Sequence, residues 1–398
     1  MPTHVIDLDL SAPWPDLDLR HSETGVLALV RWHGRPIGLV RWSAAGHIPA
    51  GQLRAAILSQ LLLPGARPTI WPAPSPLSIV VCTHERPADL VHCLNALLPI
   101  AAAGHEVLIV DNAPHTPRTA ELVARYPFRY LCEPRRGLNH ARNCGLRAAS
   151  HPFIAFTDDD AVPDPNWVNA LAQPFSFPAV GCVTGLVLPL ELETRAQELF
   201  EIYCAHRRTF TPLTFQAPPL PSAAGGVAGM GANMAFRRDL LLSLGGFDPR
   251  LDGGTLTRSG GDTDMFARVL DTGAQIVYTP EAFVWHRHRR DEAELRQCLF
   301  GYGVGLYSFL TKRLLEMGDW GALVVAARWF GGPFLRAARR RLQGQATLPL
   351  ALLLVEAAGA CVGPLRFWQA VHRSGGSGQL RPQTAQKGEE IVHDRSRA

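Results

Sequence analysis

Residues 77–87 read Leu-Ser-Ile-Val-Val-Cys-Thr-His-Glu-Arg-Pro, an apolar run followed by a polar turn. The run over 77–82 is typical of a strand that is buried on both faces. Residues 88–98 follow with apolar side chains at helical spacing, at positions 90, 91, 94, 97 and 98. The stretch therefore predicts a buried strand, a polar turn and an amphipathic helix.

The same alternation continues downstream. Three further apolar strands are expected at His105–Asp111, Phe128–Leu131 and Phe153–Thr157. Helices are expected between them, at Thr119–Tyr126 and Asn139–Ala149. Strands that alternate with helices at this pitch predict an α/β fold with a mostly parallel sheet and helices on both of its faces.

Polar side chains follow three of the predicted strands, in the segments Thr83–Arg86, Asp111-Asn112 and Asp158–Asp160. Because functional groups of such folds gather at the carboxyl ends of parallel strands, we expect the three clusters to form one site. The three consecutive carboxylates, called the Asp triplet below, repel one another unless a divalent cation or a hydrogen-bonded ligand neutralises them. A solvated acidic turn, or a helix N-cap before Pro163, is the alternative interpretation of the triplet.

Composition bounds the class of protein. The chain has 398 residues, enough for two or three domains, and 47% hydrophobic against 19% charged residues disfavours global disorder. A net charge of +4 disfavours a protein that coats nucleic acid. None of the 8 cysteines forms a Cys-x-x-Cys pair, so buried thiols in a reducing compartment are expected. The first ten residues include Asp7 and Asp9 and no apolar core, so no secretory signal is expected.

Four regions are expected along the chain. They are a small N-terminal hairpin and helix unit (1–70), a catalytic domain (75–290), a helical C-terminal region (291–372) and a disordered tail (373–398). The hairpin strands are expected at Val26–Trp32 and Ile37–Trp42, and the helix at Gln52–Leu63. Prolines at 68, 72, 74 and 76 predict a stiff linker between the first two regions.

Taken together, these segments resemble the family 2 glycosyltransferases of the GT-A fold. The resemblance rests on the order and spacing of residues 78–87, 108–112, 137–143 and the Asp triplet, and it covers residues 75–290. It implies transfer of a single sugar, with inversion, from a nucleotide-diphospho-sugar to an acceptor hydroxyl. It also implies a divalent cofactor, Mg²⁺ or Mn²⁺, because a diphosphate leaving group needs a hard cation.

The resemblance assigns roles in donor binding. Thr83 and Arg86 would lie at the nucleotide pocket, and Asp111 would hydrogen-bond the base. Arg142 would lie near the base or the diphosphate, and Asp159 would contact the ribose. The full set implied for the nucleotide-sugar is Thr83, Arg86, Asp111, Arg142, Asp158, Asp159 and Gly231. Ordinary structural roles are the alternative for each residue alone, such as an exposed helix position for Arg142.

Two positions depart from the family pattern. Relatives often have Asn where this chain has Glu85, which leaves the base specificity open. Relatives commonly have Glu-Asp where this chain has Gly261 and Asp262. Asp262 is assigned as the general base that accepts the proton of the attacking acceptor hydroxyl, with Asp264 as its alternative. Both acids could instead be those that the N-terminus of a helix favours.

Asp160 and His286 are the expected metal ligands. Asp160 would hold the cation that bridges the diphosphate, and some relatives add a histidine after the last strand of the domain. Neutral imidazole suits Mn²⁺. His288 is the alternative ligand, and both histidines could instead be basic surface residues or diphosphate contacts. Glycines at 229 and 231 would let the backbone approach the donor sugar closely.

The C-terminal region carries fewer signals. Residues 300–305, Phe-Gly-Tyr-Gly-Val-Gly, have no role that the sequence assigns. Val325 stands where the Gln-x-x-Arg-Trp motif of processive synthases needs Gln, which disfavours that class. The apolar stretch Leu348–Gly363 is shorter than the roughly 20 residues of a membrane span and contains Glu356, so a buried or interfacial helix is expected.

Residues 287–342 hold eleven Lys and Arg against five Asp and Glu. The segment Ala322–Phe330 is followed by arginines at 336, 339, 340 and 341, a mixture that could lie on an anionic membrane surface. A helix packed on the catalytic domain with a solvated basic face is the alternative. We expect a cytoplasmic protein in peripheral contact with the inner face of the cytoplasmic membrane, a lipid-linked or polysaccharide acceptor, and no nucleic-acid partner.

Two rival functions are compatible with the fold. A catalytically inactive nucleotide-sugar-binding protein stays open because Gly261 replaces the acid of the family motif. A sugar nucleotidyltransferase would need a basic, glycine-rich loop after the first strand, whereas residues 83–87 include an acid and no glycine.

Overall fold

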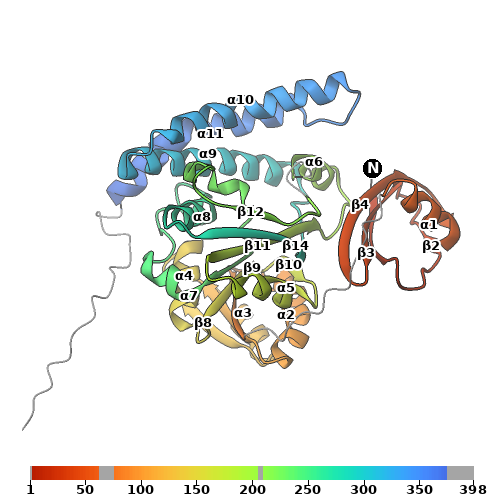
Figure 1. Ribbon diagram of the computed structural model, residues 1–398, viewed down its shortest axis with the longest axis horizontal. Helices are drawn as coiled ribbons and strands as arrows, with labels where there is room; N and C mark the ends of the chain where they lie inside the picture. Colours follow the sequence, from red (N-terminus) through yellow and green to blue (C-terminus); the bar gives the residue numbers. More distant parts are fainter. Residues whose placement is uncertain (1, 62–75, 205–208, 374–398) are drawn as a thin grey trace, which may run out of the picture.

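The computed structural model describes residues 2–61, 76–204 and 209–373. Its centre is a nine-stranded sheet in the order β10-β14-β11-β13-β9-β6-β7-β8, with β12 paired to β14 (Figure 1). The strands are β6 (Leu77–Thr83), β7 (Glu106–Asn112), β8 (Arg129–Glu133), β9 (Phe153–Asp158), β10 (Ala161–Pro163), β11 (Val180–Pro189), β12 (Leu213–Phe215), β13 (Asn233–Arg237) and β14 (Gln275–His286). Only β10, β12 and β13 oppose the common direction. The predicted α/β fold with a mostly parallel sheet is confirmed.

Helices cover both faces of this sheet. One face is covered by α2 (Pro87–Ala102), α3 (Arg118–Val123), α5 (Trp167–Ala172) and the short η1 (Gln173–Ser176). The other is covered by α4 (Leu138–Ala148), α7 (Arg238–Ser243) and α8 (Gly261–Asp271). Because strand side chains alternate, Ile79 and Val81 pack in the first layer and Val80 in the second. Burial on both faces explains why β6 reads as a continuous apolar run.

The N-terminal residues form a smaller sheet. β3 (Gly25–Trp32) pairs antiparallel with β4 (Arg35–Ser43), and β1 (Thr3–Asp9) adds to β3 in parallel. The sequence pattern did not predict β1. The remaining elements here are β2 (Leu17–Asp18), β5 (His47–Ile48) and α1 (Ala50–Leu58). The helix therefore begins earlier and ends sooner than the predicted Gln52–Leu63.

Contacts of Arg31 hold this smaller sheet against the main one. Its guanidinium lies 2.6 Å from a carboxylate oxygen of Asp164 and 4.4 Å from the ring centre of Phe283. Leu29 packs in the same apolar cluster as Phe283. The N-terminal sheet consequently lies beside β14, at one side of the molecule (Figure 1).

Three long helices form a further layer above α8 and the sheet (Figure 1). They are α9 (Glu292–Met317), α10 (Gly321–Leu342) and α11 (Leu350–Arg373), and shorter helices α6 (Arg195–Cys204) and η3 (Ser222–Val227) lie beneath them. Glycines let α9 and α11 approach closely: a Cβ at Gly303 would lie 2.1 Å from the carbonyl oxygen of Glu356, and one at Gly359 2.2 Å from that of Phe300. The Phe-Gly-Tyr-Gly-Val-Gly segment thus has a packing role.

α11 corrects one expectation about length. It has 24 residues and contains an 18-residue stretch with a mean hydropathy of 1.6, so by length and composition it is long and apolar enough to cross a membrane. The predicted stretch Leu348–Gly363 ends ten residues before the helix does, because Pro364 lies inside α11 and does not terminate it. Most of the predicted proline linker and nearly all of the predicted tail lie outside the described residues.

Candidate functional site

Several chain segments meet at one edge of the main sheet. β6, β7 and β9 end there at Thr83, Asn112 and Asp158, because the three strands are parallel neighbours. β13 runs antiparallel to β9 and begins at the same edge, and β14 ends there at His286. The polar clusters that the sequence predicts to converge therefore lie together.

Asp159 binds the two residues predicted for the nucleotide pocket. Its carboxylate accepts hydrogen bonds from Oγ1 of Thr83 and Nη1 of Arg86, both at 2.8 Å. Arg86 also donates to Asp160 and Asp89 at 2.8 Å. Burial raises the pKa of Asp159 to about 7, although the charge of Arg86 opposes this shift. Arg86 is thus the cation that holds two members of the Asp triplet in place.

Asp158, Asp160 and His286 form a group that could hold a metal ion. Their ligand atoms all lie within 4.8 Å of one another. Nε2 of His286 is 3.1 Å from Oδ1 of Asp160 and 3.5 Å from Oδ2 of Asp158. Two carboxylates and one imidazole are donors that suit Mg²⁺ or Mn²⁺, so these residues fit the expected divalent cofactor. Asp158, predicted only as a donor-binding residue, joins this group.

Neighbouring charges set the protonation of the group. Burial alone would raise the pKa of Asp160, but the charges of His286 and Arg86 hold it well below its usual range. Burial lowers the pKa of His286, but the carboxylates of Asp160 and Asp158 outweigh burial and raise this pKa to about 10. A metal-ligating imidazole is neutral, so this proton leaves before His286 can act as a ligand.

His288, the alternative ligand, lies outside the group. Its ring packs edge-on against Phe200, with the ring centres 4.7 Å apart. Its Nε2 lies 3.4 Å from a carboxylate oxygen of Glu201. The structure therefore brings His286, and not His288, to the Asp triplet.

Asp111 lies buried at the end of β7. One carboxylate oxygen accepts a hydrogen bond from the hydroxyl of Tyr130 at 2.9 Å. The other, Oδ1, is buried and has no hydrogen-bond partner within the described residues. Burial raises the pKa of this carboxyl. A buried oxygen of this kind suits an N–H donor such as that of a nucleobase.

Glu85, one of the two family departures, has a structural role. Its carboxylate accepts hydrogen bonds from the backbone N–H groups of His115 and Thr116, at 2.6 and 2.8 Å, and from the hydroxyl of Thr116 at 2.8 Å. These bonds fix the loop that follows β7. The carboxylate at position 85 is thus engaged by this loop.

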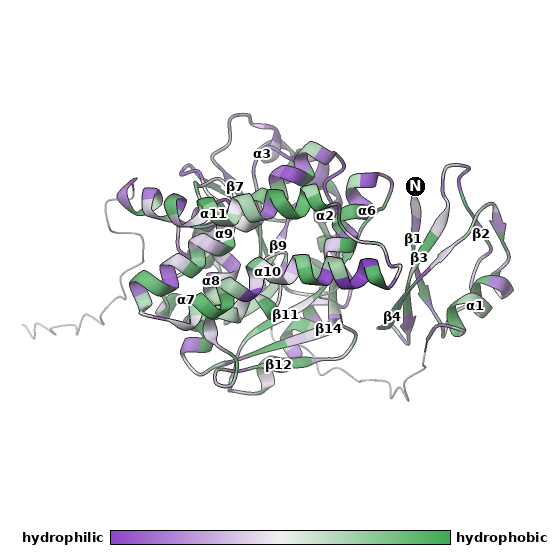
Figure 2. Cartoon of the chain, turned by 90° about the horizontal axis from the view of Figure 1, so that it is seen from above, coloured by the Kyte–Doolittle hydropathy of each residue, from purple (hydrophilic) through white to green (hydrophobic). Residues whose placement is uncertain are grey.

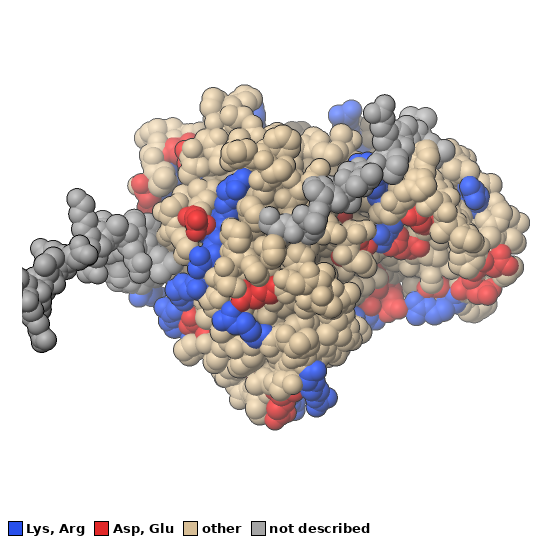
Figure 3. All heavy atoms as spheres, turned by 60° about the horizontal axis from the view of Figure 1, so that its bottom comes forward, with Lys and Arg blue, Asp and Glu red and all other residues tan. Residues whose placement is uncertain are grey.

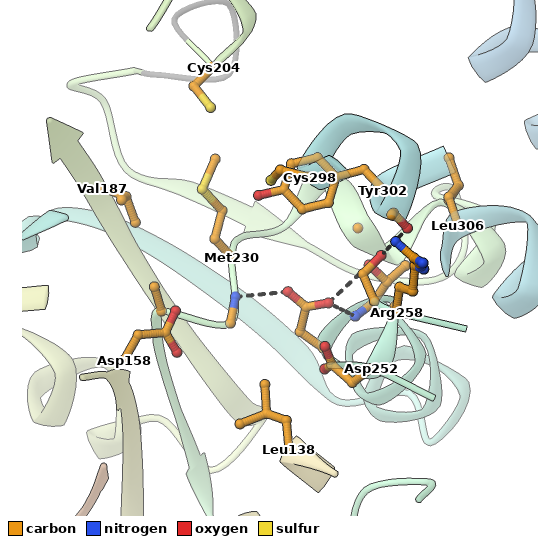
Figure 4. A pocket seen from close by; sticks show the side chains of 18 of the residues that line it. Leu138, Asp158, Val187, Cys204, Met230, Asp252, Arg258, Cys298, Tyr302 and Leu306 are labelled. Carbon is orange, nitrogen blue, oxygen red and sulfur yellow. Dashed lines mark hydrogen bonds between the residues drawn. The ribbon is translucent and has the colours of Figure 1, made fainter. Parts of the chain in front are cut away.

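A cavity of about 650 Å³ opens beside the Asp triplet. Its lining includes Asp158 and His286 from the metal group and Asp262 from α8. Figure 4 shows Asp158 on one side of the cavity and Asp252 on the other. One predicted metal ligand, His286, and the predicted base, Asp262, therefore face one space together with Asp158.

Backbone hydrogen bonds orient Asp262. The N–H of Gly231 donates to its Oδ2 at 2.8 Å, and the N–H of Thr263 donates to its Oδ1 at 2.7 Å. The side chain is half-buried in the first turn of α8. Each carboxylate oxygen keeps a second lone pair, so the group can still accept a proton.

Asp264, the alternative base, points away from the cavity. Its carboxylate lies 2.7 Å from Nζ of Lys312 and 2.9 Å from Nε of Arg268, and all three side chains are buried. Lys312 also lies 2.8 Å from Asp248. Asp264 therefore belongs to a buried ion cluster that joins α8 to α9.

Asp252 is a site residue that the sequence did not reveal. A Cβ at Gly261 would lie 2.4 Å from its Oδ2, so Asp252 fills the space where the family glutamate would begin. The same oxygen accepts a hydrogen bond from Arg142 at 2.6 Å. Its φ of 83° is rare for a residue other than glycine. The turn Asp252-Gly253-Gly254 was the only sequence signal for it.

Arg142 and the loop before α8 are held tightly. A Cβ at Gly231 would lie 2.7 Å from Nη2 of Arg142, and the Arg142 guanidinium lies 5.3 Å from the ring centre of Phe247. A Cβ at Gly305 would lie 1.9 Å from Oγ of Ser259, so α9 directly supports the loop that leads to Asp262. Arg142 is therefore buried between Asp252 and the Gly231 backbone that also contacts Asp262.

The far wall of the cavity is aromatic. It is formed by residues of α6, α9 and α10, namely Phe200, Tyr203, Tyr302 and Trp329. The rings of Tyr203 and Tyr302 stack with centres 6.1 Å apart, and the hydroxyl of Tyr203 donates to Glu356 of α11 at 2.7 Å. Figure 4 shows Tyr302 and Cys298 on this side of the cavity. Periodicity could not reveal this wall, because three separate helices supply it.

Comparison with known proteins agrees with this geometry. Residues 78–244 match the family model for Glycosyl transferase family 2. The pre-mycofactocin glycosyltransferase of Mycobacterium tuberculosis is 27% identical over 270 residues, which cover 64% of this chain and 54% of the relative. The succinoglycan biosynthesis protein ExoM of Rhizobium meliloti is 29% identical over 270 residues, covering 64% and 77%.

The chain thus spans about half the length of the mycobacterial relative. Among solved structures, a mannosyltransferase from Pyrobaculum calidifontis in complex with GDP-Man and Mn²⁺ aligns with a TM-score of 0.45 and 17% identity, over 77% of each chain. The matched segment 78–244 contains the Asp triplet, Asp111 and Arg142. Over this segment the chain is therefore similar to glycosyl transferase family 2.

Proposed function

We propose that this protein is a glycosyltransferase that moves one sugar from a nucleotide-diphospho-sugar to an acceptor hydroxyl, with inversion. One observation carries the proposal: a carboxylate in the first turn of α8, Asp262, and the group of Asp158 and His286 line the same cavity. A base and a cation-binding group that face one space suit attack on a sugar whose leaving group is a diphosphate. One of the relatives reported above is itself named a glycosyltransferase.

The donor would bind along the sheet edge. The buried, unpartnered oxygen of Asp111 suits the base, and Asp159, with Thr83 and Arg86 already bound to it, suits the ribose. Asp158, Asp160 and His286 would hold the divalent cation. A bound Mg²⁺ or Mn²⁺ would neutralise charge that develops on the departing diphosphate.

Asp262 would act as the general base. It would take the proton of the acceptor hydroxyl as that oxygen forms a bond to the anomeric carbon. The bond from this carbon to the diphosphate oxygen would break on the opposite face, and its electron pair would leave with the nucleoside diphosphate. Because the Gly231 N–H already holds one carboxylate oxygen, Asp262 needs no reorientation for this step.

Asp252 favours catalysis over the rival of a catalytically inactive binding protein. The rival depended on Gly261, which removes a carboxylate from the family motif. Asp252 returns a carboxylate to that space and bonds Arg142 there. Because Asp252 supplies a carboxylate where Gly261 lacks one, the departure at Gly261 does not favour an inactive protein.

For the acceptor and the cellular location, we propose what the sequence analysis already predicts. The acceptor would be a hydroxyl compound that meets the aromatic wall of the cavity, where flat apolar rings suit the faces of a sugar or an apolar chain. Lipid-linked and polysaccharide acceptors both meet this description. A cytoplasmic location, with peripheral contact to the inner face of the membrane, goes with nucleotide-sugar use.

The test is a thermal-shift panel of nucleotide-sugars with Mn²⁺, followed by donor turnover. A ligand that binds the folded state raises the unfolding midpoint by mass action. We expect one nucleotide class to raise the midpoint and its sugar to be released or transferred. Binding without hydrolysis or transfer on any acceptor of a broad panel would favour the inactive binding protein.

A further inference from the structure

A second pocket lies at the outer end of the helical layer. It has a volume of about 260 Å³ and opens between α6, α10 and α11. Three guanidinium groups line it, those of Arg336, Arg339 and Arg340. The rest of its lining is mainly apolar, from Ile202, Tyr203, Pro333, Ala337, Leu348 and Leu353. An apolar pocket with several guanidinium groups is suited to a ligand with an anionic head and an apolar body.

Two of the arginines that line this pocket, Arg339 and Arg340, have no acidic partner among the described residues. α10 contains no acidic residue, and its last turn holds Arg339, Arg340 and Arg341. In the described parts of the chain, no acidic side chain forms an ion pair with Arg339, Arg340 or Arg341. Guanidinium groups bind phosphate oxygens through charge-assisted hydrogen bonds. A phosphate is therefore the anion that this cluster fits.

Exposed apolar side chains continue along the two helices that form the pocket. On α10 and α11 the large apolar residues that face outward are Leu323, Val324, Phe330, Leu335, Leu342, Leu350, Leu354, Leu365 and Trp368. Leu335 is 73% exposed and Leu342 90% exposed, and both flank the arginines. Figure 2 shows α10 and α11 largely in the hydrophobic colour, with a hydrophilic end on α10. An apolar helix surface with a basic rim is typical of contact with an anionic bilayer.

The opposite side of the molecule differs in character. Figure 3 shows that on the lower face of Figure 1 the basic and acidic side chains are interspersed. The α10–α11 side instead combines the arginines of the pocket with exposed apolar side chains. Its sign and its apolar content are both complementary to an anionic lipid surface.

The packing of α11 favours a position along the bilayer surface. α11 contacts α9 at Gly359 and again at Gly363, where an added Cβ would lie 2.7 Å from the carbonyl oxygen of Val304. Contacts a turn apart hold the helix lengthwise against α9, which itself packs on α8. Its outward residues Leu354, Leu365 and Trp368 can then enter the headgroup region while the inward face stays in protein contact.

We propose that this pocket holds the phosphate-bearing head of an anionic membrane lipid, while the exposed apolar residues of α10 and α11 contact its chains. This assignment goes beyond the proposed transfer reaction, because it concerns a second ligand and a second site. Tyr203 lines both this pocket and the catalytic cavity. The lipid surface would therefore adjoin the acceptor side of the cavity.

Vesicle binding by the full chain tests the proposal. The vesicles are phosphatidylcholine alone, or phosphatidylcholine with phosphatidylglycerol. We expect binding only to the second kind. R339Q and R340Q each remove one charge from the pocket, whereas R341Q removes one charge from the same turn outside its lining. Diffuse attraction alone predicts equal losses of about fivefold for each arginine. Losses of about fiftyfold for the two pocket variants and about fivefold for R341Q would support a phosphate site.

Other outcomes overturn the proposal. Equal losses of vesicle binding for R340Q and R341Q would exclude a specific phosphate site in the pocket and leave only diffuse electrostatic attraction. Inorganic phosphate that raises the unfolding midpoint of the wild type but not of R340Q, and that displaces the protein from vesicles, would indicate a free-phosphate site. Unchanged vesicle binding in an L335S/L342S variant would show that these exposed leucines do not contact the lipid chains. D262N should bind vesicles as the wild type does, so this test stands whether or not the protein transfers sugar.

Discussion

The backbone N–H of Gly231 donates a hydrogen bond to the carboxylate of Asp262 at 2.8 Å, across the loop before β13 and the first turn of α8. The same glycine leaves no room for a side chain, because a Cβ there would lie 2.7 Å from Arg142 and 3.1 Å from Asp262 itself. Gly231 therefore fixes the predicted base and its cationic neighbour at once. This contact is the most sensitive point of the proposed site.

Gly231→Ala should lower kcat with little loss of stability. The added methyl must displace Arg142 or Asp262, and a displacement of about 1 Å at a catalytic group can lower the rate by about a hundredfold. Steady-state transfer rates and the unfolding midpoint measure the two effects. Gly331→Ala is the matched control, because nothing lies within 4 Å of a Cβ at that position. A wild-type rate in Gly231→Ala would contradict the close contact.

Asp262→Asn should abolish the base while keeping the hydrogen bond from Gly231. Removal of a general base lowers the rate by about 10²–10⁴. Donor affinity should stay near that of the wild type, since Asp262 would act on the acceptor. The transfer rate and donor titration check this. A rate within twofold of the wild type would remove Asp262 from the mechanism.

Asp264→Asn is the companion variant and should behave in the opposite way. It weakens the buried contacts to Lys312 and Arg268, and the loss of one partner from a buried ion cluster costs about 3–5 kcal/mol. The unfolding midpoint should fall, while the folded fraction keeps measurable transfer. A fully stable but inactive Asp264→Asn protein would reverse the assignment of the two acids.

Asp252→Asn should reduce transfer through Arg142. The Asp252 carboxylate, at 2.6 Å, is the charged hydrogen-bond partner of the Arg142 guanidinium, and a neutral amide there would leave that buried charge poorly compensated. Arg142→Gln should lower the transfer rate as well. The double variant should transfer sugar no more slowly than the less active of the two single variants. A double-mutant cycle of transfer rates measures this coupling. Additive losses would show that the two residues act separately.

Removal of divalent cations should stop transfer. Chelation by EDTA should abolish activity, and Mn²⁺ or Mg²⁺ should restore it, because Asp158, Asp160 and His286 form the only cation-binding group identified in the described residues. Asp160→Asn should weaken Mn²⁺ binding measured by calorimetry without donor. His288→Gln is the control and should leave Mn²⁺ affinity unchanged. Full activity in EDTA would exclude a metal-dependent mechanism.

Acid should destabilise the protein partly through Glu106. Burial opposes ionisation, but hydrogen bonds from Ser78 and Ser150, together with Arg129, lower the pKa of Glu106 from 4.5 to about 2. Because the pKa of Glu106 is lower in the folded state than in the unfolded state, its ionised form stabilises the folded protein at pH values above the unfolded-state pKa. That contribution is lost as the pH falls from 4.5 toward about 2. Glu106→Gln should therefore be less stable than the wild type at neutral pH, and the difference should shrink at about pH 3. Denaturant titrations at the two pH values test this, and a constant difference would contradict it.

The central architecture could be predicted from the sequence because its signals are local. Continuous apolar runs such as residues 77–82 identify strands buried on both faces, and their alternation with helical spacing identifies a parallel sheet. Parallel strands end at one edge by geometry, so Thr83, Asp111 and Asp158 had to lie together once the fold was known. The strand β1 was missed, since its partner β3 lies beyond a long loop.

The choice between neighbouring acids and histidines was not local. Asp262 and Asp264 are two residues apart on one helix, and only the packing of Lys312 from α9 turns Asp264 into the core. His286 and His288 differ in the same way, because Glu201 of α6 takes the second histidine. The side chain of Asp252 fills the space beside Gly261, and the turn that brings it there has no periodic sequence pattern.

The sequence by itself determined the alternation of strands and helices over residues 77–157, the resemblance to a family and the chemical types of side chain at the sheet edge. Hydrophobic periodicity and strand ends depend on residues that are close together in the chain, so they can be recognised from the sequence alone. The tertiary structure alone decided which carboxylate faces the cavity, which histidine joins the Asp triplet and which helices form the aromatic wall and the arginine pocket. Those outcomes depend on contacts between segments far apart in the chain, whose free energy is set by packing and burial in three dimensions.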